Sequence, residues 1–263
     1  MAATRGVLTS IVGMLEGGAT HIGVATDHVI ESFRNSMWAG YKTGAGVDPR
    51  LLDQFPLLEE GLAAMGVACW PMIDLEADDA LASAAAIAAR SPEVGRIYIC
   101  SPDKDLAQCV DGRVLQLDRR SAKVTDVAAV REKFGVPPAS IPDYLALVGD
   151  SADGYPGLPG WGARSAAAVL DKFGSLDAIP ADPTDWGLAL RGAEKLGLTL
   201  REQWDNALLF RRLARLRNDA PLFEEISEIA WRGPADSFNA FCRRLDASRL
   251  PGRAQSLSRL RGF

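Results

Sequence analysis

Residues 148–162 read VGDSADGYPGLPGWG and join two acids to a loop rich in glycine and proline. The acids are Asp150 and Asp153, and the loop leads into a predicted helix over Arg164–Phe173. Glycines allow backbone N–H groups to approach a phosphate, and the helix N-terminus adds a favourable dipole. A tight turn between two helices, with no ligand, is the alternative interpretation. The loop lies only a few residues after Asp150, which favours a phosphate-binding site next to an acidic one.

Three further acidic clusters stand upstream, each where a strand or loop is predicted to end. They are Asp27; Glu76, Asp78 and Asp79; and Asp103 and Asp105. So many carboxylates in one place would repel one another unless cations lay between them. Oxygen ligands favour Mg²⁺ or Mn²⁺ over zinc, and the pattern suggests a two-metal phosphoryl site. Taken singly, each cluster could instead cap a helix or close a turn.

Predicted strands and helices alternate through the first 118 residues. This order predicts an α/β fold with a parallel sheet, whose carboxyl edge would collect the acids. The strands expected are Ile22–Ala25, Val67–Met72, Arg96–Cys100 and Val114–Leu117. The helices expected there are Arg5–Leu15, Pro49–Met65, Glu76–Arg90 and Lys104–Val110, with Arg34–Val47 as an exposed segment. Further helices are expected over Val127–Phe134, Pro142–Val148, Leu200–Leu216 and Phe238–Leu245.

The composition excludes several classes of protein. The net charge is 29 − 34 = −5, but without the eight clustered acids it would be 29 − 26 = +3, so it does not exclude a nucleic-acid partner. Two histidines exclude chemistry built on several imidazoles, and none of the four cysteines has C-x-x-C spacing for zinc. No apolar run reaches membrane length and no signal peptide follows Met1, so we expect a cytoplasmic protein without membrane contact.

The acidic motifs as a set resemble those of the flap endonuclease superfamily, and most of all bacterial 5′–3′ exonucleases such as the 5′ nuclease domain of DNA polymerase I. The motifs are EADD at Glu76–Asp79, SPDKD at Ser101–Asp105 and the stretch from Val148 to Gly162. The resemblance implies a PIN-like parallel-sheet nuclease core, then a helix-hairpin-helix region and C-terminal helices. We expect boundaries at 1–118, 119–182 and 183–263, with the last region on the core.

The resemblance also implies a role for each site residue. Those expected around the first metal are Asp27, Glu76, Asp78 and Asp79, with Asp78 near both metals. Those expected around the second are Asp103, Asp105, Asp150 and Asp153. Arg34 and Lys42 would contact the scissile phosphate or the 5′ strand and, with Asp78, serve catalysis. Further DNA contacts are expected from Tyr41, Lys104, Gly157, Gly160, Gly162, Arg164 and Ser165, with K⁺ at the helix-hairpin-helix.

The function expected is a metal-dependent 5′ nuclease acting on DNA at flaps, nicks or RNA-primed 5′ ends, as a monomer, in replication or repair. Two alternatives stay open: a structure-specific DNA-binding protein with weakened catalysis, and a PIN-type ribonuclease. From Trp186 to Phe263 there are 14 Lys and Arg against 9 Asp and Glu. This basic excess suits a phosphate substrate, and solvated helix faces explain it equally well.

One departure from the family concerns the beginning of the chain. The family begins with a strand that carries an additional metal-ligand Asp, whereas the helix expected to follow that strand begins at Arg5 here. Either the start lies further upstream, or this is a shortened form without that strand and that ligand. In both cases we expect an open place in the sheet beside Ile22–Ala25.

Overall fold

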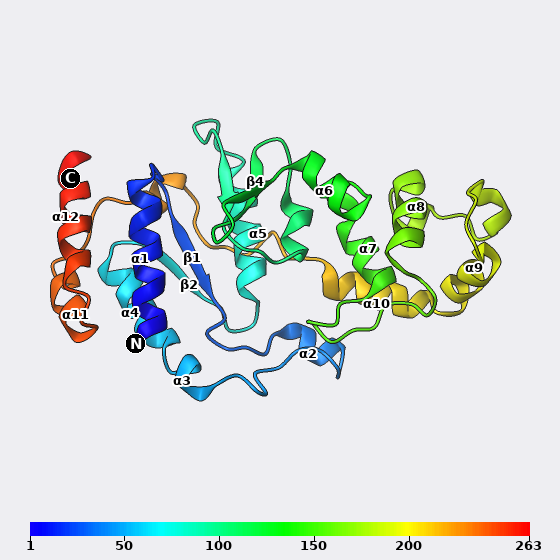
Figure 1. The fold of residues 1–263 in the computed structure, drawn as a ribbon, viewed down its shortest axis with the longest axis horizontal. Helices are drawn as coiled ribbons and strands as arrows, with labels where there is room; N and C mark the ends of the chain where they lie inside the picture. The colour runs from blue at the N-terminus through cyan, green and yellow to red at the C-terminus, as the bar shows by residue number, and fades with distance from the viewer. The chain divides into compact units, whose positions relative to one another are not determined.

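The computed structural model describes all residues, 1–263, and divides them into two compact units (Figure 1). Unit 1 comprises residues 1–32, 44–87 and 219–263, and unit 2 comprises residues 33–43 and 88–218. Each unit therefore draws on segments that are far apart in the sequence. No helix is both long and apolar enough to span a bilayer.

Unit 1 is built on two parallel strands, β1 (Gly23–Thr26) and β2 (Ala68–Pro71). Gly23 pairs with Ala68, and the indole of Trp70 lies across Gly23, where an added Cβ would come within 2.2 Å of the ring. That indole also stacks on Phe223, with ring centroids 5.9 Å apart. A glycine at position 23 thus leaves the space that the end of the indole ring occupies.

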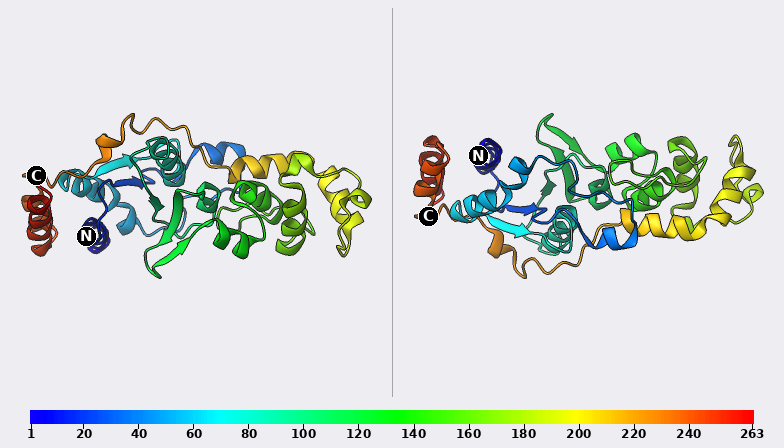
Figure 2. Two further views of the ribbon diagram at one scale, coloured as in Figure 1. Left: turned by 90° about the horizontal axis from the view of Figure 1, so that it is seen from above. Right: turned by 90° about the horizontal axis from the view of Figure 1, so that it is seen from below.

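The helices of unit 1 bury a continuous apolar core. Two of them, α1 (Ala2–Glu16) and α4 (Phe55–Ala64), contact each other, and α12 (Arg249–Leu260) lies beside α1 (Figure 2). The core residues include Leu8, Leu62 and Trp231, and the Trp231 indole donates to Met65 O at 2.9 Å. The remaining elements of unit 1 are α3 (Pro49–Leu52), α5 (Ala77–Ala88), η5 (Ile226–Ile229) and α11 (Phe238–Arg244).

Unit 2 contains the second sheet, with strand order β3-β4-β5. The first two, β3 (Ile97–Ile99) and β4 (Val114–Asp118), are parallel, and β5 (Lys123–Thr125) returns antiparallel to β4. The parallel pair confirms the predicted α/β architecture. The β4–β5 hairpin was missed because three residues, two of them exposed, give no alternating apolar signal.

Helices form the larger part of unit 2. They are α2 (Phe33–Met37), α6 (Val127–Phe134), α7 (Ile141–Val148), α8 (Ala163–Phe173), α9 (Ala193–Glu202) and α10 (Trp204–Ala214). Short 3₁₀ turns connect them: η1 (Asp105–Cys109), η2 (Pro138–Ser140), η3 (Leu176–Ala178) and η4 (Pro183–Trp186). The core centres on α7, which contacts both α8 and α10.

The loop between α7 and α8 crosses closely over the end of α7. Gly149 and Gly157 both have positive φ, +82° and +69°. A Cβ on Gly157 would lie 2.6 Å from Leu147 O and 2.3 Å from Gly149 N, so the backbone of the loop packs directly against the backbone at the end of α7. Only glycine provides both the conformation and the space at this position.

The strands form two separate sheets and not one continuous parallel sheet. β1 has β2 on one edge and no strand on the other, and β3 likewise pairs only with β4. Two predicted helices are interrupted: the one over 49–65 divides into α3 and α4, with Pro56 in the first turn of α4, and the one over 200–216 divides at Gln203. Residues 183–218 belong to unit 2 and residues 219–263 to unit 1.

Candidate functional site

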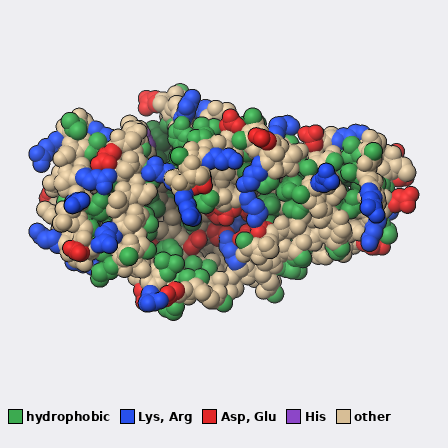
Figure 3. Space-filling view, in the orientation of Figure 1, with side chains coloured by type: hydrophobic (Ala, Val, Ile, Leu, Met, Phe, Trp, Pro, Cys, Tyr) green, Lys and Arg blue, Asp and Glu red, His purple; other side chains and the backbone are tan.

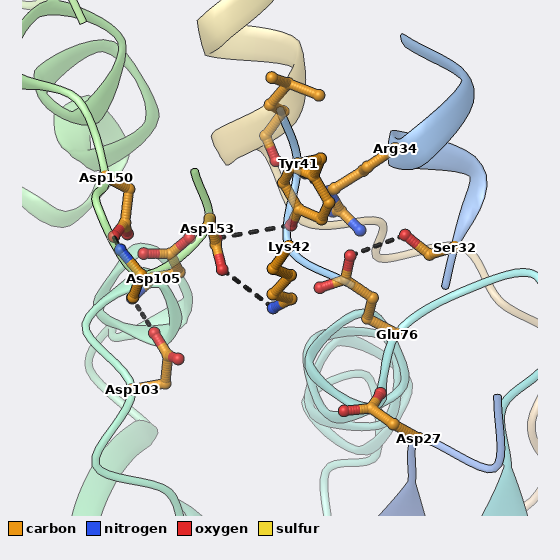
Figure 4. Close-up of polar contacts among 12 residues, drawn as sticks. Asp27, Ser32, Arg34, Tyr41, Lys42, Glu76, Asp103, Asp105, Asp150 and Asp153 are labelled. Carbon is orange, nitrogen blue, oxygen red and sulfur yellow. Dashed lines mark hydrogen bonds and ion pairs between the residues drawn. The ribbon is translucent and has the colours of Figure 1, made fainter. Parts of the chain in front are cut away.

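Three acids of unit 2 gather into one buried cluster, the acidic triad Asp105, Asp150 and Asp153. One carboxylate oxygen from each lies within 4.8 Å of the others, and the three side chains point toward one another (Figure 4). All three are buried. Asp105 begins η1, the first element after β3, whereas Asp150 and Asp153 lie in the loop after α7.

Local hydrogen bonds fix the loop that carries two members of the triad. The Asp150 N–H donates to Tyr155 O at 2.8 Å and the Tyr155 N–H returns to Asp150 O at 3.0 Å. The Asp150 carboxylate also accepts from the Ala152 N–H at 2.9 Å. These bonds fold residues 150–155 into a tight turn that carries both carboxylates.

Two lysines accompany the triad. Lys104 forms an ion pair with Asp150, and Lys42 Nζ lies 3.0 Å from Asp153 Oδ1. Partial burial acts to lower the pKa of Lys104, but the hydrogen bond and charge of Asp150, with the charges of Asp105 and Asp103, raise it overall. Three carboxylates against two ammonium groups leave a formal charge of 2 − 3 = −1.

Asp105 is the unsatisfied member of the triad. Its Oδ1 is buried and has no hydrogen-bond partner. Burial, followed by the charges of Asp103, Asp153 and Asp150, raises the pKa of Asp105 well above its ordinary range. A buried, unpaired carboxylate oxygen among other carboxylates is costly, and a hard divalent cation is the ligand that removes the cost. The residues present therefore fit a divalent metal ion.

Asp103 lies beside the triad and is not a member of it. Its Oδ1 accepts from the Asp105 N–H at 2.9 Å, and its side chain is exposed (Figure 4). It thus forms an Asx-type turn immediately before η1. Of the four acids expected around the second metal, the structure brings three together and places the fourth in a turn.

The acids of unit 1 surround the beginning of α5. Asp27 Oδ1 accepts from the Ala77 N–H at 2.7 Å, and Asp79 Oδ2 accepts from the Glu76 N–H at 3.0 Å. These carboxylates satisfy amide groups that the first helical turn leaves without partners. Asp78 is half-buried in the same turn. Two of the four expected metal ligands of this group, Asp27 and Asp79, thus also cap a helix.

Glu76 has a partner that the sequence did not indicate. The Ser32 hydroxyl donates to Glu76 Oε1 at 2.7 Å, and Glu76 is buried (Figure 4). Ser32 lies 44 positions upstream, and a lone serine between predicted elements carries no signal of such a contact.

The segment 34–47 was expected to be exposed, but its part in unit 2, residues 34–43, is partly buried. The Trp38 indole donates to Gly154 O at 3.0 Å, and the Lys42 N–H donates to Asp153 O at 3.0 Å. These bonds bring Lys42 and Tyr41 to the triad, and the Tyr41 hydroxyl lies 3.4 Å from Asp153 Oδ2. The prediction of an exposed segment was wrong for this part, because Trp38 and Tyr41 anchor it.

Arg34 is likewise buried, with 1 % of its surface exposed. Its Nε donates to Leu213 O at 2.8 Å and its Nη2 to Arg215 O at 3.1 Å. These are carbonyls of the last turn of α10 and just beyond it, so the guanidinium caps the end of that helix. The alternative of plain surface charge is excluded, and contact with a substrate stays a prediction.

The predicted DNA-binding loop leads directly into α8. The Ser165 hydroxyl accepts from the Gly162 N–H at 3.0 Å and so caps the helix. Arg164 is exposed in the first turn, as are Gly160 and Gly162 before it. The loop therefore presents backbone and one cation at a helix N-terminus, an arrangement suited to a phosphate.

The basic excess of the C-terminal region has a structural explanation in part. Lys and Arg side chains gather over α12 and α1 (Figure 3). Arg253 pairs with Glu16 at 2.6 Å, and Arg244 pairs with Glu60. Arg261 donates to Ala19 O at 2.9 Å. These contacts favour helix packing over phosphate binding for those arginines.

Two family models match consecutive parts of the chain. The 5′–3′ exonuclease N-terminal resolvase-like domain matches residues 1–135, and the 5′–3′ exonuclease C-terminal SAM fold matches residues 136–237. The chain belongs to the 5′–3′ exonuclease family. This family membership confirms the resemblance seen in the acidic motifs.

Curated relatives of this 5′–3′ exonuclease family member include DNA polymerases I and a flap endonuclease. DNA polymerase I of Bacillus caldotenax is 35 % identical over 227 residues, 84 % of this chain and 25 % of that protein. Flap endonuclease Xni of Edwardsiella ictaluri is 32 % identical over 210 residues, 80 % of each. The chain thus spans about a quarter of the length of several polymerase relatives and most of the length of the flap endonuclease.

Solved structures show the same fold. The bacteriophage T5 flap endonuclease, in a pseudo-enzyme–product complex with DNA and metal ions, superposes with a TM-score of 0.62 at 17 % identity. The match covers 95 % of this chain and 89 % of the T5 chain. The fold class expected from the sequence is thereby confirmed.

Proposed function

We propose that this protein is a metal-dependent 5′ nuclease that hydrolyses DNA phosphodiesters at 5′ flaps, nicks or 5′ ends. The observation that carries the proposal is the buried acidic triad with its unpaired Asp105 oxygen, in a member of the 5′–3′ exonuclease family. A carboxylate cluster of this kind has little use in a protein that only packs, because it destabilises the metal-free fold.

Two groups of carboxylates would each hold a divalent cation, Mg²⁺ or Mn²⁺. In unit 2 the ligands are the triad, with Asp103 close by; in unit 1 they are drawn from Asp27, Glu76, Asp78 and Asp79. When bound, such cations activate water at neutral pH and stabilise charge on the scissile phosphate. The T5 relative bound to DNA and metal ions supports this assignment.

The two lysines of the site have a double role in this proposal. In the metal-free protein they neutralise Asp150 and Asp153. A cation bound by those carboxylates would compete with the ammonium groups and release them toward the phosphate of the substrate. Lys42 and Lys104, each about one-third exposed, are placed to make that exchange.

The loop before α8 would hold the duplex backbone. Gly157 allows the loop to pass close to the end of α7. Gly160 and Gly162 expose backbone groups, and Arg164 supplies a positive charge. Carbonyl groups of such a loop are suitable ligands for K⁺. Action at RNA-primed ends, in replication or repair, follows from the same substrate class.

The test separates binding from chemistry. Asp105→Asn should reduce cleavage of a 5′-flap DNA in Mg²⁺ by about 100-fold or more, while binding of the flap stays intact or tightens. Asp171→Asn is the matched control, because Asp171 is exposed on α8 with only Arg131 as a partner. Normal cleavage by Asp105→Asn would refute the metal site.

A DNA-binding protein with weakened catalysis is the second candidate function. It predicts that the wild-type chain binds 5′-flap DNA and cleaves none in either Mg²⁺ or Mn²⁺. The same cleavage assay therefore decides between the two functions.

A further inference from the structure

Tyr155 has a buried hydroxyl that no group in the protein satisfies. The residue is 1 % exposed, and its hydroxyl has no hydrogen-bond partner. A buried phenol without a partner is destabilising, whereas phenylalanine would fill the same space without that cost. A bound ligand that forms a hydrogen bond with the hydroxyl would explain why a tyrosine occupies this position.

The backbone places this side chain beside the acidic triad. Tyr155 and Asp150 exchange both backbone hydrogen bonds of an antiparallel bridge. Residues paired in this way project their side chains to the same side, with Cβ atoms about 5.5 Å apart. The phenol thus leaves the turn on the side of the Asp150 carboxylate.

Packing leaves the ring little freedom. Tyr155 stacks on Phe210 of α10, with ring centroids 5.7 Å apart and planes inclined by 24°. The ring is thus held in a fixed position, with its hydroxyl in the interior of unit 2.

Tyr155 is the second unsatisfied group at this site. The other buried side-chain atom without a partner is Asp105 Oδ1, a member of the triad itself. A bare cation would satisfy the carboxylate and leave the phenol alone. A hydrated cation would satisfy both, because its water molecules are strong hydrogen-bond donors.

We propose that the Tyr155 hydroxyl accepts a hydrogen bond from a water molecule carried by the divalent cation at Asp105, Asp150 and Asp153. Tyr155 is then a positioning residue, which orients the hydration shell of the ion without touching the ion. The inference rests on the proposed function, since it requires a metal ion at the triad. Groups in this outer position typically change metal affinity 10- to 100-fold.

The test is a titration of the whole chain with Mn²⁺ in the absence of DNA, in which electron paramagnetic resonance measures the bound Mn²⁺. Tyr155→Phe should raise the Mn²⁺ dissociation constant by about 10-fold or more. Its metal-free melting temperature should stay equal to that of the wild type or rise, because an unsatisfied hydroxyl is removed. A role in packing alone cannot produce this combination of weaker binding and undiminished stability.

Tyr144→Phe is the matched control. Tyr144 is also buried in unit 2, but its ring packs edge-on against Phe134, and burial alone raises its pKa. Its Mn²⁺ affinity should equal that of the wild type.

Two results would overturn the inference. The first is a Tyr155→Phe variant that binds Mn²⁺ with wild-type affinity. The second is a Tyr155→Phe variant that loses Mn²⁺ affinity and also has a lower metal-free melting temperature. If the wild-type chain itself binds no Mn²⁺, the proposed function fails first and the inference fails with it.

Discussion

Replacing Asp105 by asparagine should stabilise the metal-free protein and abolish its stabilisation by metal. At an effective dielectric of 20, two unit charges 4.8 Å apart repel by about 3.5 kcal/mol. Asp105 faces two such neighbours, and Lys104 and Lys42 offset much of the repulsion. We therefore expect a net gain of about 1–3 kcal/mol, which raises the melting temperature by about 2–10 °C.

Adding metal should make the wild type more stable than Asp105→Asn, which reverses their order of stability in EDTA. A cation at 100 times its dissociation constant stabilises a folded protein by about 2.7 kcal/mol, or about 5–10 °C here. Wild type should show this shift when Mg²⁺ replaces EDTA, and Asp105→Asn should lose most of it. The assay is thermal unfolding by circular dichroism, with Asp171→Asn as the control that keeps wild-type behaviour in both conditions.

The same pair of proteins gives a pH test. Because the pKa of Asp105 is raised in the folded state, folding favours its protonated form. The cost of ionising it is absent below the unfolded pKa of about 4 and grows as pH rises through the folded pKa. Without metal, the stability advantage of Asp105→Asn should thus be large at pH 8 and shrink toward pH 4. An advantage independent of pH, or a mutant less stable than wild type in EDTA, would refute the electrostatic reasoning.

Three further predictions concern the surroundings of the site. Gly157→Ala should destabilise the fold by about 2–4 kcal/mol in thermal unfolding, because φ is +69° and an added Cβ would clash with backbone atoms. Gly112→Ala is the control and should be nearly neutral, because the space around Gly112 is open. Lys104→Met should cost about 1–2 kcal/mol in EDTA by leaving Asp150 without its counter-ion, and Mg²⁺ should restore most of that loss in the same measurement. Arg164→Ala should weaken duplex binding and reduce the slope of log affinity against log salt by about 1, as fluorescence anisotropy would show; an unchanged slope would remove Arg164 from the interface.

Much of the fold was predictable because its signals are local. The strands at 22–25, 67–72, 96–100 and 114–117 are apolar runs that end at turns or acids, and each appears within a residue or two of its expected place. The helix α12 was missed because Pro251 and Gly252 near its start are typical of a turn. The break between α9 and α10 carries no proline or glycine, so only tertiary packing determines it.

The candidate site was predictable in its residue types and less so in its contacts. The sequence indicated Asp105, Asp150 and Asp153, since acids after strands and in turns are visible as motifs. It did not indicate that Arg34 would be buried as a helix cap, because the carbonyls it reaches lie 179 and 181 positions away. Tyr155 stood within the decisive stretch, but only the structure shows that its hydroxyl has no partner.

The central claim is that this chain cuts DNA at 5′ ends with the help of divalent metal. The most direct measurement uses one duplex with a 5′ flap and one with a 3′ flap, each labelled on the flap strand, incubated with the wild-type chain. We predict cleavage of the 5′-flap substrate in Mg²⁺ or Mn²⁺, none in EDTA, and a product that keeps a 5′-phosphate. Cleavage that persists in EDTA, or that prefers the 3′ flap, would contradict the account.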